Sequence, residues 1–192
     1  MYLTLTRLIL VFSLIEIIVS SGQIPLLKID RISPTVKAIQ SDVVMLSDIL
    51  GISRVVGGFA GMTRNFPHIT NRLEDYRMHK TVLAPTDEAI AAMPRKPWEN
   101  PDEYSTLGSE AYEGEEGEER ADQNLQKFVE SHIIPLSPWA DKMKVETLAG
   151  TEYWWHLKDG YRIIQPGDIK VLDVMRSSEE DSELWIIDGV MS

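Results

Sequence analysis

The fold is decided by a ten-residue stretch in the middle of the chain, Thr81-Val-Leu-Ala-Pro-Thr-Asp-Glu-Ala-Ile90. Its first four residues are typical of a short buried strand. Thr86 is a preferred helix N-cap residue, and Asp87 follows in the first turn, where the helix dipole favours negative charge. The stretch therefore predicts a strand that passes through Pro85 directly into a helix, which Pro94 ends.

Two helical segments are predicted on the N-terminal side of this stretch. From Ser41, apolar residues recur on one helical face, and Gly51 is a stop signal. Residues 52–66 form a second helix-like segment, which Pro67 closes.

An acidic segment and a clear helix follow on the C-terminal side. Residues 95–123 contain prolines, glycines and a run of glutamates over 110–119, and they are predicted to be a long acidic loop insertion. The next segment has apolar residues at i, i+3, i+4, i+7 and i+8, which predicts a helix that Pro135 stops. The residues in this pattern are Leu125, Phe128, Val129, His132 and Ile133.

The remainder of the chain is predicted to be β structure. Asp159-Gly160 lies between Tyr153–Leu157 and Tyr161–Ile164, and Asp-Gly between such runs is a strong hairpin signal. Residues 169–175 and 184–187 are two further strands. Helices first, one strand–helix unit and then a β meander indicate an α+β fold with a largely antiparallel sheet.

Composition excludes several classes of function. The chain has 192 residues, a formal net charge of −11 and no cysteine. The acidic balance argues against nucleic acid as a partner and against binding to an anionic membrane surface. The absence of cysteine excludes disulfides, thiol catalysis and Cys-ligated zinc.

The N-terminus has the pattern of a secretory signal peptide. Arg7 precedes an apolar run, and small residues follow, so that residues 1–21 are predicted to be removed by cleavage between Ser21 and Gly22. An uncleaved anchor is the alternative, but the run is shorter than the ~20 residues of a membrane span. Residues 22–40 are predicted to be an extended lead-in, and no transmembrane segment is expected after cleavage.

The chemical motifs of enzymes are missing. The sequence has no Gly-x-Ser-x-Gly, and Ser131 and His132 are neighbours on a helix, where adjacent side chains do not face each other. The four histidines lack metal-ligand spacing, and Gly57–Gly61 lacks the spacing of a phosphate loop. No catalytic residue, metal site or cofactor is therefore expected. His132 is predicted to be a buried, hydrogen-bonded histidine.

Tryptophans are the candidate anchors for a partner. Trp154 and Trp155 are consecutive in a predicted strand and therefore face opposite sides of the sheet. One of them is expected in the core and the other on a surface where it can contact a partner. Trp98 and Trp139 are expected to pack.

Four pieces of the chain, in order, resemble the fasciclin (FAS1) domain family and cover about residues 40–192. Thr81–Ile90 resembles the first signature, Asn124–Pro135 the middle helix with its Tyr-His pair, Thr147-Leu-Ala-Gly150 the next turn, and Leu184–Met191 the closing strand. The tyrosine position of the pair holds Ser131. The residues that match the structural motif are Thr81, Pro85, Thr86, Asp87, His132, Gly150 and Asp188. With its acidic insertion, the chain is similar to fungal single-domain fasciclin-like proteins.

The resemblance implies a fold and a role. The fold is a compact β-wedge of mainly antiparallel strands with helices packed on it, which places the domain at 41–192. The role is adhesion or matrix interaction at a cell surface, without catalysis. Asp168-Ile169 matches an Asp-Ile pair that animal members use in integrin-type adhesion, although Gly167 and Lys170 depart from the flanking pattern. The candidate partner-binding residues are Asp168, Ile169, Trp154 and Trp155.

Two functions are therefore carried forward. The first is a secreted or cell-surface domain that binds a protein or glycan. The alternative is a small-molecule or lipid-binding domain in a vacuole-type lumen, with a pocket between helices and sheet lined by Gly57–Gly61 and His132. A hydrolase ranks third, and no oligomeric state is indicated.

Overall fold

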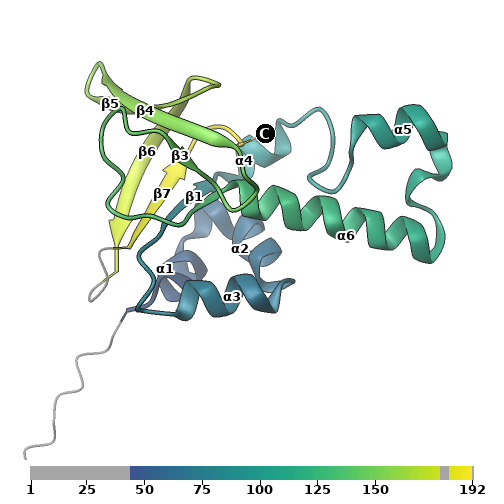
Figure 1. The fold of residues 1–192 in the computed structure, drawn as a ribbon, viewed down its shortest axis with the longest axis horizontal. Helices are drawn as coiled ribbons and strands as arrows, with labels where there is room; N and C mark the ends of the chain where they lie inside the picture. The colour runs from purple at the N-terminus through teal and green to yellow at the C-terminus, as the bar shows by residue number, and fades with distance from the viewer. Residues whose placement is uncertain (1–43, 178–181, 192) are drawn as a thin grey trace, which may run out of the picture. The chain divides into compact units, whose positions relative to one another are not determined.

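The computed structural model describes residues 44–177 and 182–191 (Figure 1). The predicted signal peptide of residues 1–21, its cleavage point at Ser21 and Gly22, and the lead-in of residues 22–40 lie outside the described residues. The described helices are α1 (Leu46–Ile52), η1 (Arg54–Val56), α2 (Gly57–Arg64), α3 (Pro67–Glu74), α4 (Asp87–Ala91), α5 (Pro101–Leu107), η2 (Gly108–Tyr112) and α6 (Gly114–Ser131). The strands are β1 (Thr81–Pro85), β2 (Ile133–Ile134), β3 (Val145–Glu146), β4 (Glu152–Lys158), β5 (Tyr161–Gln165), β6 (Ile169–Arg176) and β7 (Glu183–Ile187).

The strands form one seven-stranded sheet in the order β2-β1-β7-β6-β5-β4-β3. The pair β1–β7 is parallel and the other pairs are antiparallel. The α+β class and the largely antiparallel sheet are thereby confirmed.

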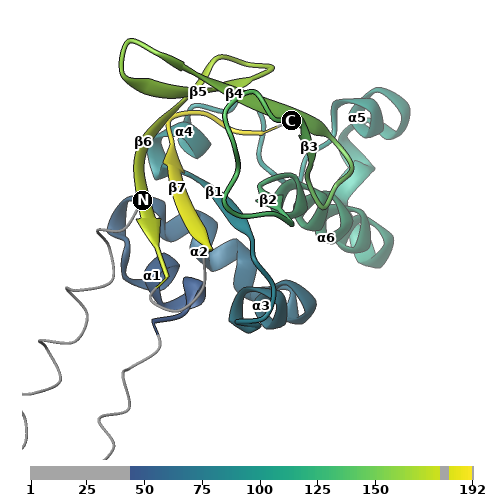
Figure 2. The same ribbon diagram turned by 60° about the vertical axis from the view of Figure 1, so that its left-hand side comes forward.

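Two apolar cores lie on opposite faces of the central strands. One core joins α1, α2, α3 and α6 to β1 and β7, and the other is enclosed where β3, β4 and β5 fold over the same two strands. Figure 2 shows the helices α1–α3 and the β4–β5 hairpin on opposite sides of β7. Because both faces of these two central strands are covered, every residue of β1 and of β7 is buried.

The strand–helix stretch folds as its sequence predicts. β1 ends at Pro85, and the Thr86 hydroxyl accepts a hydrogen bond from the Ala89 amide at 3.1 Å. The side chain thereby satisfies one of the unpaired amides of the first turn of α4.

The predicted hairpin is also confirmed. β4 and β5 pair in register on either side of Asp159-Gly160, with Lys158 opposite Tyr161. Asp159 and Gly160 have φ values of 52° and 82°, as a two-residue turn that follows the twist of the strands requires.

Residues 95–123 are not the loop that was predicted. They form α5, η2 and the first half of α6, and Figure 1 shows these elements projecting from the rest of the domain. We call residues 95–123 the arm, and residues 44–94, 124–177 and 182–191 the body. The arm is ordered by polar contacts: the Arg120 guanidinium donates twice to the Ala111 carbonyl, at 2.9 and 2.8 Å, and Asn124 donates to Glu103 at 2.9 Å.

Two helix boundaries also differ from the prediction. Pro67 does not merely end a helix; it is the first residue of α3, a position where its missing amide costs nothing. α6 ends at Ser131, so that Ile133 belongs to β2 and pairs with Val82. Among the described residues, no helix combines the length and apolarity that a membrane span requires.

Candidate functional site

His132 lies completely buried where α6 ends. Its Nε2 accepts a hydrogen bond from the Met191 amide at 3.0 Å, so the ring proton resides on Nδ1, which donates to the Phe128 carbonyl at 2.7 Å. The rings of Phe59 and Phe128 lie 5.2 and 4.5 Å from the imidazole. Burial lowers the pKa of His132 to about 4, against a smaller opposite effect of the Phe128 carbonyl. His132 is therefore a neutral link between α6 and the C-terminal segment.

Ser131 and His132 contact each other, which the helical spacing did not predict. The Ser131 hydroxyl lies 3.1 Å from His132 Nδ1, because His132 has already left the helix with φ −98° and ψ 6°. The hydroxyl donates instead to the Phe128 carbonyl at 2.7 Å. Since Nδ1 carries the proton, it has no lone pair to accept one from Ser131. The pair is not arranged as a nucleophile with its base.

The glycine segment at the start of α2 is explained by Asp87. The Asp87 carboxylate accepts a hydrogen bond from the Gly58 amide at 2.8 Å, and thus supplies an anion at the start of α2. A Cβ atom at Gly58 would lie 3.0 Å from the same carboxylate oxygen. The pocket that was predicted to join Gly57–Gly61 to His132 does not form, because His132 is enclosed in the core and Asp87 meets the glycines.

The other residues of the family motif hold the backbone. The Thr81 hydroxyl donates to the Leu136 carbonyl at 2.8 Å, and Pro85 pairs with Ile187 across the parallel strands. Gly150 has a φ of 81°, and the Asp188 carboxylate accepts from the Lys170 amide at 2.8 Å.

The four candidate contact residues are separated by the structure. Ile169 and Trp155 are 7% and 8% exposed and belong to the core between the layers of the sheet, so neither can contact a partner. Asp168 is exposed in the turn before β6, where its carboxylate accepts from the Gln165 amide. Trp154 is half-buried on the opposite face of β4 from Trp155, as the strand period predicts.

Trp154 is part of a larger surface, which we call the outer face. It is the solvent side of β4, β5 and β6, and it consists of Trp154, His156, Tyr161, Ile163, Lys170 and Leu172. His156 pairs with Ile163, and Ile163 pairs with Lys170, so that their side chains lie on one side. Sequence analysis identified Trp154 alone, although the alternation in β4 and β5 carried the signal for the rest. Within the part of the chain that is described, no three His, Asp or Glu side chains are grouped to hold a metal ion.

Fold and signature residues together define a FAS1-type domain. A solved structure of a FAS1 domain pair from the insect cell adhesion molecule fasciclin I has a similar fold, with a TM-score of 0.50 at 14% identity over 77% of this chain and 50% of that chain. No protein-family model matches the chain.

Curated fungal relatives give the family. FAS1 domain-containing proteins of Neurospora crassa, Aspergillus fumigatus and Emericella nidulans are 51%, 47% and 41% identical over 77%, 77% and 82% of this chain. The chain belongs to the FAS1 domain family. It spans 64%, 63% and 66% of the length of these relatives.

Proposed function

We propose that this chain is a non-enzymatic binding domain that enters the secretory pathway and attaches to a protein at a cell surface or in a matrix. The observation that carries the proposal is the outer face, where Tyr161 and Leu172 are 46% and 48% exposed beside Trp154. A few aromatic and aliphatic anchors supply most of the binding energy of a protein interface. The adhesion role of the insect protein with the same fold supports this assignment.

A protein fits the outer face better than a glycan does. Sugar rings bind by stacking on uncovered aromatic faces. Here the Trp154 ring meets His156 at 5.3 Å, and the Lys170 ammonium group lies 3.3 Å from the centre of the Tyr161 ring. The groups left for a partner are ring edges and the aliphatic side chains of Ile163 and Leu172, which suit the apolar centre of a protein interface.

The test is attachment of the labelled, purified domain to cells of the source organism. The double variant Tyr161→Ala/Leu172→Asp is expected to attach at least tenfold more weakly (about 1.4 kcal/mol or more), because it removes one anchor and places a charge on the apolar surface. The matched control is Leu107→Asp, which adds the same charge at a residue of the arm that is 46% exposed. Trp154→Ala and Asp168→Asn are tested separately: Trp154 lies opposite Gln165 in the β4–β5 pair, and Asp168 accepts from that Gln165 in the turn beside the outer face.

Each result bears on a different part of the proposal. Loss of attachment after proteolysis of the cell surface, but not after glycosidase treatment, supports a protein partner. The reverse pattern replaces it with a glycan. Unchanged attachment of the double variant removes the outer face as the contact, and no attachment of the unmodified domain overturns the adhesion role.

The location is tested on the native protein. We expect its N-terminus to be Gly22, after removal of residues 1–21, and the protein to be found in the medium or at the cell surface. A protein that is cleaved but held in a vacuole-type lumen would favour the alternative small-molecule function.

A further inference from the structure

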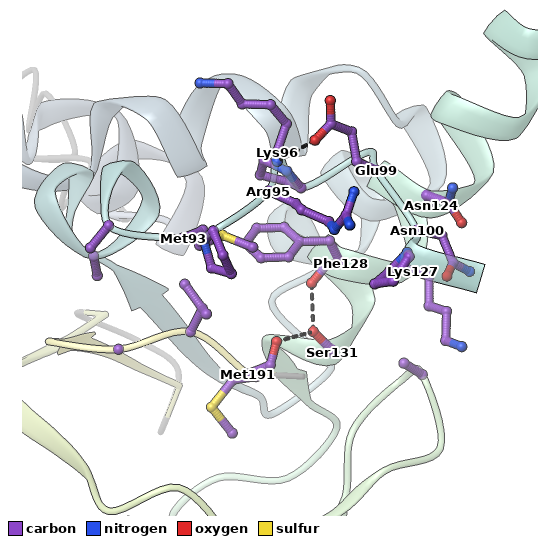
Figure 3. A pocket seen from close by; sticks show the side chains of 18 of the residues that line it. Met93, Arg95, Lys96, Glu99, Asn100, Asn124, Lys127, Phe128, Ser131 and Met191 are labelled. Carbon is purple, nitrogen blue, oxygen red and sulfur yellow. Dashed lines mark hydrogen bonds between the residues drawn. The ribbon is translucent and has the colours of Figure 1, made fainter. Parts of the chain in front are cut away.

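A groove of about 620 Å³ lies between α4, the segment 94–101, α6 and the C-terminal segment 188–191 (Figure 3). It is separate from the outer face, none of whose residues line it. Its volume is within the range of sites that bind small molecules.

The floor of the groove is apolar. Phe128 and Met93 pack together there, and Figure 3 shows the Phe128 ring beside Met93. Val190 packs against the same cluster and completes the floor, whereas Met191 borders the groove with its backbone carbonyl, 3.4 Å from the Ser131 hydroxyl, and buries its side chain in the core between the layers of the sheet. The floor is thus built from the end of α4, from α6 and from the C-terminal segment, and His132 joins the last two through Phe128 and Met191.

The rim carries three cationic side chains, Arg95, Lys96 and Lys127, on a chain whose formal net charge is −11. Arg95 lies over the Tyr104 ring, with 5.0 Å from its guanidinium carbon to the ring centre. Within the described residues, neither the Lys96 nor the Lys127 ammonium group has a hydrogen bond or an ion pair.

The two carboxylates at the rim, Glu99 and Asp188, form no ion pair with these cations among the described residues. Glu99 accepts from the Lys96 backbone amide at 3.0 Å and from the Tyr104 hydroxyl at 3.3 Å. Asp188 accepts from the Lys170 amide at 2.8 Å. Both carboxylates accept from neutral donors, and the charged side chains that line the groove, three cations and two carboxylates, sum to a formal charge of +1.

We propose that the groove binds a single-chain amphiphile with an acidic head group, of the fatty-acid class. Its hydrocarbon chain lies on the floor of Met93, Phe128 and Val190, and its carboxylate faces Arg95, Lys96 and Lys127. The apolar floor supplies most of the binding energy by removing the hydrocarbon from water. The cations select the charge of the head group.

Titration calorimetry with the whole domain tests this, with myristate as the probe and myristyl alcohol and tetradecyltrimethylammonium as its neutral and cationic counterparts. We expect myristate to bind with one site per chain and more tightly than both counterparts. Arg95→Gln/Lys127→Gln is expected to weaken myristate about fivefold to tenfold and to leave the alcohol unchanged. The control Lys158→Gln removes a lysine at the β4–β5 turn, outside the groove, and is expected to change neither.

A second variant separates loss of the site from loss of the fold. Ala92→Trp fills the groove from an exposed position, and we expect it to abolish myristate binding while circular dichroism and the Tm stay as in the unmodified domain. Absence of binding to the unmodified domain, equal affinity for acid and alcohol, or binding retained by Ala92→Trp would each overturn the assignment. So would a dimer of the unmodified domain that covers the groove with a second copy and that myristate does not dissociate. These outcomes are independent of the outer-face variants, whose readout is attachment to cells.

Discussion

The body and the arm are held by different kinds of contact. In the body, apolar side chains from helices and strands meet on both faces of β1 and β7, and three tryptophans pack in the core between the layers of the sheet. In the arm, order comes from the Arg120 contacts to the Ala111 carbonyl, from the Tyr112 hydroxyl on Glu103 at 2.7 Å, and from Gly117 packed against the Tyr112 backbone. The stability of the body therefore rests on its packed apolar side chains. The order of the arm rests on a few polar groups, each of which can be removed by a single substitution.

The largest effect is expected from Trp185→Ala in the body. Trp185 is completely buried, stacks on Trp139 at 5.2 Å and meets Trp155 edge-on at 5.7 Å. Its removal is expected to lower the free energy of unfolding by about 3–5 kcal/mol, because it leaves a large cavity. Chemical denaturation measures this. Trp98→Ala, at a tryptophan that is 38% exposed, is the control and is expected to change little; similar losses in both variants would contradict the assigned core.

Acid is expected to weaken the body through His132. Its folded-state pKa of about 4 lies below the ordinary value of 6.5, so the unfolded chain takes up the proton first. Protonation of His132 costs no stability above about pH 6.5; the loss grows as the pH falls towards 4 and amounts to about 3 kcal/mol at pH 4. Denaturation curves from pH 7 to pH 4 test the slope, which should be shallower in His132→Gln.

Nuclear magnetic resonance gives a readout that does not depend on the variant folding. We expect the His132 ring to stay neutral, with its proton on Nδ1, down to about pH 4. A ring that becomes charged near pH 6 in the folded protein would show that His132 Nε2 does not accept the hydrogen bond from the Met191 amide in a buried site.

A pair of glycine substitutions compares the arm with the body directly. A Cβ atom at Gly117 would lie 2.3 Å from the Tyr112 carbonyl carbon, whereas a Cβ atom at Gly61 in α2 meets nothing within 4 Å. Gly117→Ala is expected to destabilise the arm by about 1–3 kcal/mol through overpacking. Gly61→Ala is expected to be neutral or to stabilise by about 0.5–1 kcal/mol. Hydrogen exchange should show Gly117→Ala opening α5 and η2 while β1 and β7 stay protected; equal opening of the body would show that arm and body unfold as one unit.

The smallest effect is expected from Arg120→Ala. Its loss leaves the buried Ala111 carbonyl without its two donors, which costs about 1 kcal/mol, confined to the arm. Hydrogen exchange in residues 101–112 measures it. Lys158→Ala at the hairpin turn is the control, and an effect of equal size there would remove the special role of Arg120.

The parts of the fold that were predicted correctly are those whose chemistry is local. The strand, the Thr86 cap and the Asp159-Gly160 turn each need neighbours within a few residues, so the pattern was sufficient. The arm was predicted to be a loop because like charges dominate residues 110–119 and no apolar period marks it. Its stabilising contacts join residues that lie up to 26 positions apart, such as Trp98 and Asn124.

The candidate site was predicted only in part, for the same reason. Trp154 was identified because alternation along a strand sends neighbours to opposite faces. Ile169 was predicted by resemblance to contact a partner, but its side chain packs in the core. It lies so close to Gly189 that a Cβ atom added at Gly189 would be 3.1 Å from Ile169 Cγ1. The groove was not predicted, because its floor and rim come from segments that are distant in sequence.

By itself the sequence determined the α+β class, the strand–helix stretch, the hairpin, the acidic charge and the lack of thiol chemistry, all of which follow from composition or from short-range periodicity. The tertiary structure alone decided that His132 is neutral, that Asp87 meets the Gly58 amide, that residues 101–123 are largely helical, and that cations without ion pairs among the described residues border an apolar groove. Each of these depends on which polar groups are brought within hydrogen-bond distance or removed from water, and that is settled only when distant segments pack together.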